Sequence, residues 1–420
     1  MDRAAGRIVK TYVTLTLLST FASSFIWGIN TLFLLDAGLT VTQAFTANAF
    51  FTAGQVVFEI PTGIVADTRG RRTSFLLGTA ALFAATIFYL WLWQLQGPFW
   101  AWAVVSAFLG LGFTFFSGAT EAWLVDGLKA AGYHQDLDSV FAKGAIAMGI
   151  AMLTGTVAGG LVAQYTNLGV PYIMRIVALG ATFLIAAFMM HDEGFTARSR
   201  TGFIAEIKEI VSESMEFGLR NRPIRWMMLS ALFSGGVAIF GFYAMQPYLL
   251  ELYGQSDSYL IAGISAAIVA AAQIVGGLLV PYIGRLFQKR TSLLLVGTAV
   301  SAGALFLIAL VGNFWLVLLL LAVWAVVFAA IGPVRQSYMN GLIPSAQRAT
   351  VLSADNMMNS ASGVVVQPVL GKVADVYGYP ASYLGSAAIQ VMALPLIALA
   401  RKENAESDPI EDANSTPRPS

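Results

Sequence analysis

The chain has 420 residues, of which 57% are hydrophobic and only 11% are charged, whereas soluble domains carry about 25% charged residues. So few charges cannot cover a surface that faces water, and the composition therefore predicts an integral membrane protein. The net charge of +1 gives no global field to attract nucleic acid, and the absence of cysteine excludes disulfides, thiolate catalysis and cysteine zinc sites.

The two histidines, His134 and His191, both fall in predicted loops, so we expect no histidine metal cluster, no haem and no other cofactor. A membrane enzyme is poorly supported because neither a nucleophile nor a metal cluster stands out. We therefore expect a protein that is not an enzyme.

Apolar runs of about 20 residues, the length that crosses a bilayer, occur twelve times along the chain. The first run follows a basic amino end and is longer than the core of a signal peptide, which has about 7–15 residues. The predicted spans are 11–35, 42–66, 73–95, 99–128, 139–165 and 171–190, then 222–252, 258–283, 291–311, 314–341, 350–376 and 381–400.

Basic residues fall on one side of this predicted topology, and only Arg175 and Lys372 lie toward the other. By the positive-inside rule, both termini are expected in the cytoplasm of a multi-pass protein of the cell (inner or plasma) membrane. An odd number of spans would scatter the basic residues over both faces.

A long polar connection divides the spans into two sets of six. We predict an amino-terminal bundle over 1–190, a cytoplasmic linker over 191–221, a carboxy-terminal bundle over 222–400 and a disordered cytoplasmic tail over 401–420. Within the linker, apolar residues at helical spacing predict an amphipathic interfacial helix, which is either a simple tether or a surface for regulation or a partner: Phe203, Ile207, Ile210, Val211 and Phe217.

A short charged turn, Gly63-Ile-Val-Ala-Asp67-Thr-Arg-Gly70-Arg71-Arg72, separates the second and third spans. The stretch from Gln55 to Leu77 aligns without gaps to Gln273 to Leu295, including a basic pair followed by Thr-Ser. Two like halves predict a binding cavity between them, near the bilayer midplane.

With its twelve spans and basic central loop, this turn resembles the signature between helices 2 and 3 of the major facilitator superfamily. The resemblance covers both halves and implies an all-α membrane protein of two pseudo-symmetric six-helix bundles. In the second copy, Arg285 and Gln288 stand where the first has Asp67 and Gly70.

Two motifs of the family's drug/proton antiporters are degraded here. Ser106 stands where those exporters usually have an arginine in helix 4. Helix 5 reads Gly155-Thr156-Val-Ala-Gly159-Gly160, without the usual proline. Both departures weaken the resemblance to antiporters and leave the resemblance in fold intact.

The resemblance also implies a network that gates the two halves. Asp67 would accept hydrogen bonds from the amino end of helix 11, whose dipole favours an anion. The alternative is that the arginines of the turn only set topology. The predicted network comprises Gly63, Asp67, Gly70, Arg71, Arg72, Asp126 and Glu59.

Glu121 and Arg335 are ionisable residues inside predicted spans, where such residues are costly and are candidates for function. Ser106, Gly110, Ser117 and Glu121 share one stripe of a continuous helix 4, which suggests a face turned to a water-filled cavity. We hypothesise that Glu121 faces Arg335 and that protonation or substrate breaks the pair. The alternatives are a static ion pair or an arginine that extends to the headgroups.

Helices 1, 4, 7 and 10 line the cavity in this family, and their candidates for substrate contact are Phe25, Asn30, Phe116, Tyr243, Gln246 and Trp324. Asn30 and Gln246 stand out because an unpaired amide inside a span is costly. Asp355, in the first turn of helix 11, is explained by the helix dipole alone.

These observations predict a secondary active transporter that exports a small amphipathic organic compound by alternating access, with protons as the coupling ion. No Walker-type nucleotide loop occurs that could supply ATP drive. We expect a monomer whose partners are a small-molecule substrate, protons and the lipid bilayer. An importer or facilitator of a small metabolite, or a membrane receptor that does not transport, are the alternatives.

Overall fold

A computed structural model describes the chain over residues 3–116, 118–133, 137–197, 208, 212, 214–344 and 347–410. Over these residues the chain is helical and forms no strand, with a single isolated β-bridge between Lys289 and Pro409. Its contacts divide it into two compact units. Unit 1 comprises Met1–Ile207, Phe242–Ala267 and Gln367–Lys372, and unit 2 comprises Lys208–Gly241, Ile268–Val366 and Val373–Ser420.

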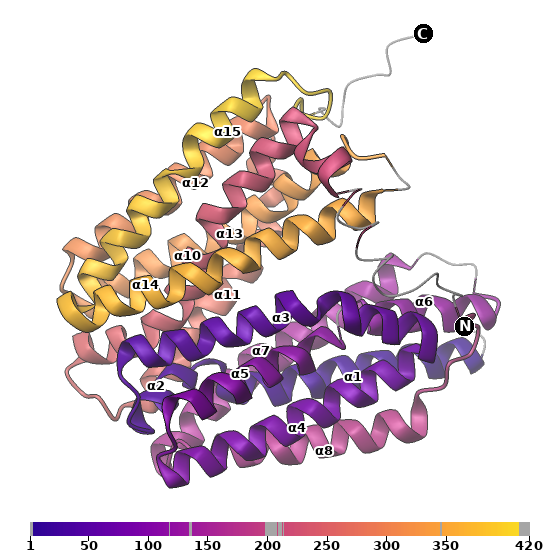
Figure 1. Ribbon diagram of the computed structural model, residues 1–420, viewed down its shortest axis with the longest axis horizontal. Helices are drawn as coiled ribbons and strands as arrows, with labels where there is room; N and C mark the ends of the chain where they lie inside the picture. Colours follow the sequence, from indigo (N-terminus) through magenta and orange to yellow (C-terminus); the bar gives the residue numbers. More distant parts are fainter. Residues whose placement is uncertain are drawn as a thin grey trace. The chain divides into compact units, whose positions relative to one another are not determined.

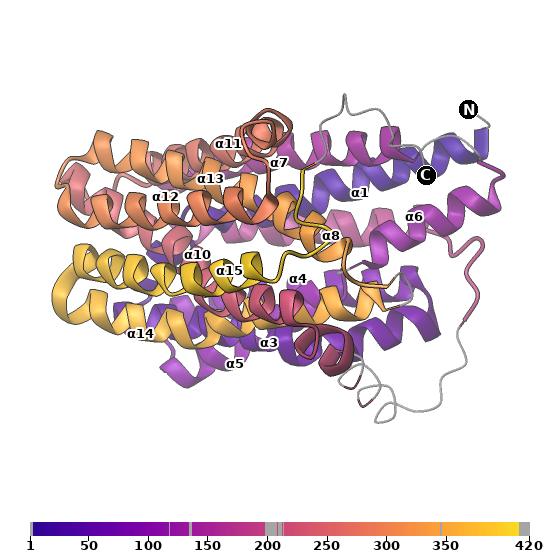
Figure 2. The same cartoon turned by 90° about the horizontal axis from the view of Figure 1, so that it is seen from above.

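Unit 1 contains the first eight helices, which correspond to the first six predicted spans (Figure 1). Their bounds are α1 Arg3–Trp27, α2 Asn30–Asp36, α3 Val41–Arg69, α4 Arg71–Leu95, α5 Phe99–Thr114, α6 Ala119–Ala130, α7 Asp138–Tyr165 and α8 Val170–Met189. Within this unit α3 packs along α5, α1 packs along α7 and α8, and α4 packs along α5 and α8. The view from above shows the same neighbours running alongside one another (Figure 2).

The remaining helices are η1 Ser214–Leu219, α10 Arg222–Tyr253, α11 Tyr259–Gly284, α12 Arg290–Leu310, α13 Phe314–Asn340, α14 Arg348–Val391 and α15 Ala393–Lys402. In unit 2, α12 packs against both α13 and α15. The end of α10 and the start of α11 belong by their contacts to unit 1. The first division between the units, after Ile207, lies within the predicted linker.

Ten helical stretches are long and apolar enough to cross a membrane, and an eleventh is the pair α1 and α2, bent by 48°. One of the ten, Thr350–Lys402, has 53 residues, which is about 80 Å of helix and far more than a bilayer needs. Gly378, with φ of 83°, reverses the chain inside it. The described part of the chain therefore holds the twelve predicted spans.

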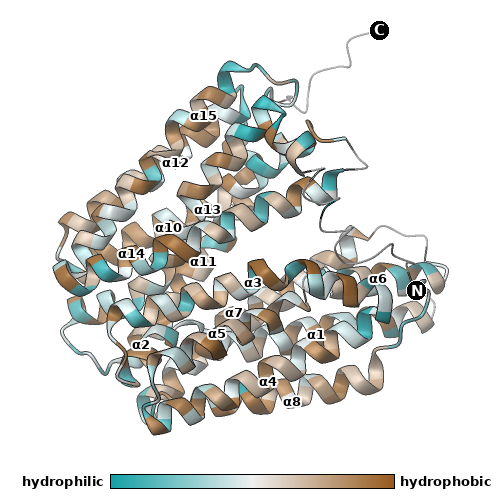
Figure 3. Cartoon of the chain, in the orientation of Figure 1, coloured by the Kyte–Doolittle hydropathy of each residue, from teal (hydrophilic) through white to brown (hydrophobic). Residues whose placement is uncertain are grey.

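Large apolar side chains lie exposed along these helices, among them Trp100, Phe188 and Leu278. Hydrophobic colour runs along the helices of each unit, and much of the hydrophilic colour lies at helix ends and turns (Figure 3). In water such exposure would be unfavourable, whereas lipid is as apolar as these side chains. The surface is therefore that of a membrane protein.

The signature turn is closed by an acid from the end of the sixth span. Gly70 has φ of 101°, and a side chain there would place its Cβ 2.2 Å from Asp192 Oδ2. Asp192 Oδ1 accepts a hydrogen bond from the Arg72 backbone N–H at 2.9 Å, and the Arg72 guanidinium donates to the Ala187 carbonyl at 2.8 Å. Glycine is therefore favoured here by the backbone angle, and any side chain would displace the Asp192 carboxylate.

The second repeat closes its turn in the same way, with Asp408 from beyond the twelfth span. Asp408 accepts hydrogen bonds from the Thr291 N–H at 2.8 Å and the Thr291 hydroxyl at 2.9 Å. The Arg290 guanidinium donates to the carbonyls of Ser407 and Pro409. The predicted disorder from residue 401 is therefore wrong as far as Ile410, because a buried carboxylate fixes this segment; residues 411–420 lie outside the described part.

Most of the predicted interfacial helix of the linker also lies outside the described residues, including Phe203, Ile207, Ile210 and Val211. The described segment Ser214–Leu219 is a π-helix, in which Phe217 packs against the core of unit 2.

Candidate functional site

Unit 2 contains a cavity of about 470 Å³ among α10, α12, α13, α14 and α15. The apolar residues that line it include Met227, Leu294, Phe328, Met339 and Ile397. The polar and charged residues that line it are Ser230, Ser234, Thr298, Ser301, Arg335, Gln336, Asp355, Asn356, Asn359 and Gln390. A cavity of this volume, mainly apolar but with a few convergent polar groups, is typical of small-molecule sites.

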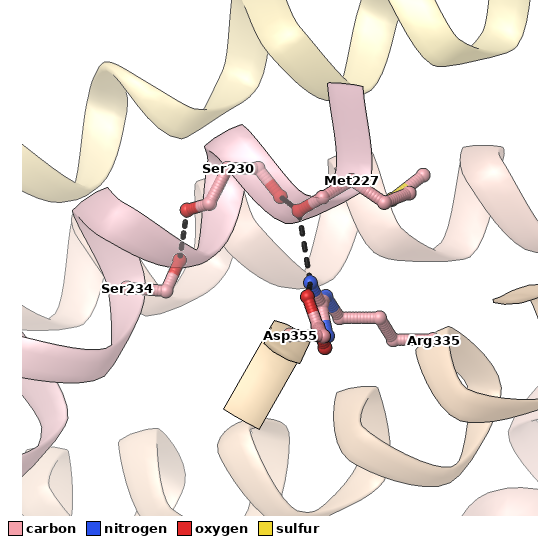
Figure 4. Close-up of polar contacts among 5 residues, drawn as sticks. All are labelled: Met227, Ser230, Ser234, Arg335 and Asp355. Carbon is pink, nitrogen blue, oxygen red and sulfur yellow. Dashed lines mark hydrogen bonds and ion pairs between the residues drawn. The ribbon is translucent and has the colours of Figure 1, made fainter. Parts of the chain in front are cut away.

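An ion pair between Arg335 and Asp355 is part of the lining of this cavity, and Figure 4 shows its contacts. Both terminal nitrogens of Arg335 donate to the Asp355 carboxylate, Nη2 to Oδ1 at 2.6 Å and Nη1 to Oδ2. Nη2 also donates to the Met227 carbonyl at 2.8 Å. The Asp355 side chain is only 4% exposed and that of Arg335 is 22% exposed.

The three groups come from three helices, so the pair ties α10, α13 and α14 together. On α10, Ser230 Oγ donates to the same Met227 carbonyl at 2.7 Å, and Ser234 Oγ donates to the Ser230 carbonyl (Figure 4). A neutral Asp355 would no longer attract the Arg335 charge, which would weaken the link between α13 and α14, whereas the hydrogen bond from Arg335 to the Met227 carbonyl on α10 does not depend on Asp355. Chemically, the arrangement can couple a proton or an anionic ligand to helix movement.

The carboxylate that pairs with Arg335 is therefore not the predicted one. Asp355 had been assigned to the dipole of its helix, whereas Glu121 is exposed and belongs to unit 1. Asp355, Asn356 and Asn359 lie on one turn of a predicted span. The rule that ionisable residues in spans are functional candidates, applied to Glu121, would equally have selected Asp355.

The stripe argument for Glu121 fails because helix 4 is broken. α5 ends at Thr114 and α6 begins at Ala119, with a turn that includes Gly118 at φ of 66°, so the spacing across it is not helical. Ser106 is buried with its hydroxyl 2.5 Å from that of Tyr89, and Gly110 packs on the backbone of α3. Ser106 and Gly110 therefore face neighbouring helices of unit 1. Ser117 lies outside the described residues.

Gln246, a predicted substrate contact, is engaged with the backbone of unit 1. The first span breaks between α1 and α2, which leaves backbone groups without helical partners. Gln246 Nε2 donates to the Trp27 carbonyl at 2.7 Å, and Gln246 Oε1 accepts from the Thr31 N–H at 3.0 Å. One amide thus satisfies both sides of the break.

Replacing Gln246 with methionine, which has a similar shape, should leave the Trp27 carbonyl and the Thr31 N–H unpaired. Each buried polar group without a hydrogen-bond partner costs about 1–3 kcal/mol, so the unfolding free energy should fall by about 2 kcal/mol or more. Thermal unfolding of the purified protein checks this, with Gln94→Met, at an exposed position on α4, as the control. Equal stability of the two variants would contradict the capping role.

The other predicted cavity residues are also held by packing or hydrogen bonds. Asn30 is buried and bonded to Asn48 and Tyr172 in unit 1. Phe116 packs edge-on against Phe75 at 4.8 Å between ring centroids. The Tyr243 carbonyl accepts from the Thr31 hydroxyl at 3.0 Å; Trp324, which is 2% exposed, stacks on Phe328, and Phe25 is buried in the core of unit 1.

Of the predicted gating network, the structure brings Asp67 and Arg71 together, 2.5 Å apart, and uses Gly70 and Arg72 to close the turn. Glu59 is half-buried and Gly63 exposed on α3, and Asp126 lies on α6 beside the turn at Gly194. The contact of Asp67 with helix 11 would join the two units and stays a prediction. No metal site is formed by the His, Asp and Glu side chains of the described residues.

The fold matches that of known transporters. The family model described as Major Facilitator Superfamily matches residues 12–366 and 266–419. The chain belongs to the Major Facilitator Superfamily. No curated protein matches this major facilitator in sequence.

Solved structures similar to this major facilitator include the nucleoside transporter NupG, with a TM-score of 0.76, 13% identity and coverage of 96% of this chain and 100% of that chain. A D-xylose-proton symporter matches with a TM-score of 0.71, 15% identity and coverage of 94% and 97%. A peptide transporter POT in complex with sulfate matches with a TM-score of 0.72, 13% identity and coverage of 94% of each chain. Identities this low establish the shared fold alone.

Proposed function

We propose that this major facilitator is a proton-coupled transporter of a small amphipathic organic compound, which works by alternating access. The observation that carries the proposal is the cavity of unit 2, whose lining is mainly apolar and includes the Arg335–Asp355 pair. A ligand with an apolar body and a polar group would match this mixed lining. The carboxylate that we propose for coupling is Asp355, in place of the Glu121 predicted from sequence.

We keep export from the cytoplasm across the cell membrane as the proposed direction, with both termini cytoplasmic as the distribution of basic residues indicates. Uptake of a polar metabolite is the second candidate. It is favoured by the amides that line the cavity and by the nucleoside, peptide and xylose transporters that share the fold.

The test uses the purified chain in proteoliposomes, with an imposed pH gradient of either sign and a panel of amphipathic compounds, nucleosides, dipeptides and pentoses. Proton-coupled transport predicts that one class accumulates above its equilibrium level under one sign of the gradient and stops when an ionophore dissipates it. Accumulation against a proton influx identifies export by antiport, and accumulation with it identifies symport. Absence of movement for every class, relative to empty liposomes, would refute the proposal.

A further inference from the structure

A buried arginine in unit 1 has no anionic partner. Arg175 lies on α8 and is 2% exposed. Arg175 and Lys372 are the two basic residues that the predicted topology places toward the outer side. Its Nε donates to the Thr86 hydroxyl at 3.1 Å, whereas its Nη2 has no hydrogen-bond partner. In the described part of the chain, no carboxylate lies within ion-pair distance of this guanidinium.

The surroundings of Arg175 offset its charge only in part. The titratable side chains near it are Tyr89, Tyr172 and Tyr243, which are neutral, and its guanidinium lies 6.0 Å from the centre of the Phe113 ring. Arginine remains charged in proteins, and a buried unpaired charge is strongly destabilising. An aromatic face and one hydroxyl compensate weakly for lost hydration. The site therefore favours an anion that arrives from outside the chain.

A second unfilled donor belongs to the same polar cluster. Tyr172, one turn before Arg175 on α8, donates its hydroxyl to Asn30 Oδ1 at 3.0 Å, and Asn30 Nδ2 donates to Asn48 Oδ1 at 3.2 Å. Asn48 Nδ2 is buried and has no acceptor among the described residues. The unfilled positions at Arg175 and Asn48 are both donors, and an ionised carboxylate is an acceptor only.

We propose that Arg175 is the base of an anion-binding site in unit 1, which binds the carboxylate of a small organic acid. This inference goes beyond the proposed transport function, whose ligand site is the cavity of unit 2. The site is separate from the cavity of unit 2, whose lining residues all belong to the other unit. The aromatic residues near Arg175 suit an acid whose carboxylate is attached to a planar apolar body.

The experiment measures binding by the purified full-length protein, independently of transport. Sodium benzoate, benzamide and sodium chloride are titrated at constant ionic strength while thermal unfolding and equilibrium affinity are followed. Benzoate should raise the Tm in a saturable way, and benzamide, its neutral counterpart, should bind at least about tenfold more weakly.

Three variants locate the site. Arg175→Gln should abolish the difference between benzoate and benzamide, and Arg175→Lys should retain part of it because it keeps the charge but loses the bidentate geometry. Thr86→Asp places a carboxylate beside the guanidinium, so it should raise the Tm without added anion and remove the benzoate response. The Thr86→Asp variant tests the proposal even if Arg175→Gln does not fold.

The proposal is overturned if benzoate and benzamide stabilise the wild type equally, or if the benzoate response survives in Thr86→Asp or Arg175→Gln. A rise in Tm with chloride but not with benzoate overturns the proposal that the site binds an organic acid. It assigns the site to an inorganic ion instead. If benzoate binds as expected but no compound moves in proteoliposomes, the proposed transport fails and the anion site stands. If neutral compounds are transported and benzoate does not bind, the anion site fails and transport stands.

Discussion

Asp355→Asn is expected to abolish coupled transport and to lower the unfolding free energy by about 3 kcal/mol. The substitution keeps the shape of the side chain and removes its charge, which leaves the Arg335 guanidinium unpaired inside the cavity. Removing one partner of a buried ion pair typically costs about 3–5 kcal/mol, and the partial exposure of Arg335 places the value at the lower end. Thermal unfolding and gradient-driven flux in proteoliposomes measure the two effects.

The double variant Asp355→Asn with Arg335→Gln separates stability from coupling. Removing both charges should restore most of the lost stability, because neither charge is then buried alone, but it should not restore gradient-driven flux. Asp257→Asn, at an exposed position before α11, is the matched control and should leave both properties near wild type. Full gradient dependence in the double variant would show that this pair has no part in coupling.

Among the glycine-to-alanine substitutions in unit 1, Gly159→Ala is expected to destabilise the protein most. The added Cβ would lie 1.9 Å from the Phe25 carbonyl oxygen and 2.8 Å from its carbon, where α7 packs along α1. Backbone atoms on both sides cannot rotate away, so the helices must separate. Overpacking usually costs about 1–3 kcal/mol, and a clash this close should reach or exceed the upper value.

Gly277→Ala on α11 is the control, because a Cβ there meets nothing within 4 Å. It should leave the Tm unchanged or raise it slightly, since alanine favours a helix by up to about 1 kcal/mol over glycine. If the two alanine variants unfold at the same temperature, the close approach of α1 and α7 is not what glycine at position 159 provides.

The spans could be predicted because a bilayer imposes one demand on every helix, a long apolar run, and the sequence displays it directly. The turn after Asp67 and its copy at Arg285 could also be read, since their basic residues and glycines interrupt those runs. The family followed from these two features, and the family model confirms it.

The candidate site was harder to predict because the sequence can indicate that a polar side chain is buried but not which group is its hydrogen-bond partner. Gln246 was recognised as significant, but the break that it satisfies, between Trp27 and Thr31, leaves no mark in an apolar run. The prediction for Glu121 assumed that helix 4 is continuous, whereas α5 and α6 are separate helices. Asp355 and Arg335 are 20 residues apart in sequence, and only the return of the chain in α14 makes them neighbours.

The acids that close the two signature turns also define what was duplicated in this chain. Each lies beyond the sixth helix of its half, Asp192 against Arg72 and Asp408 against Thr291. The unit of duplication therefore extends past its last helix to include a trailing acidic segment. A half-protein built for separate expression should end after these residues, near Gly194 in the first half and Ile410 in the second, because a cut at the membrane boundary would remove the residue that fastens the third helix.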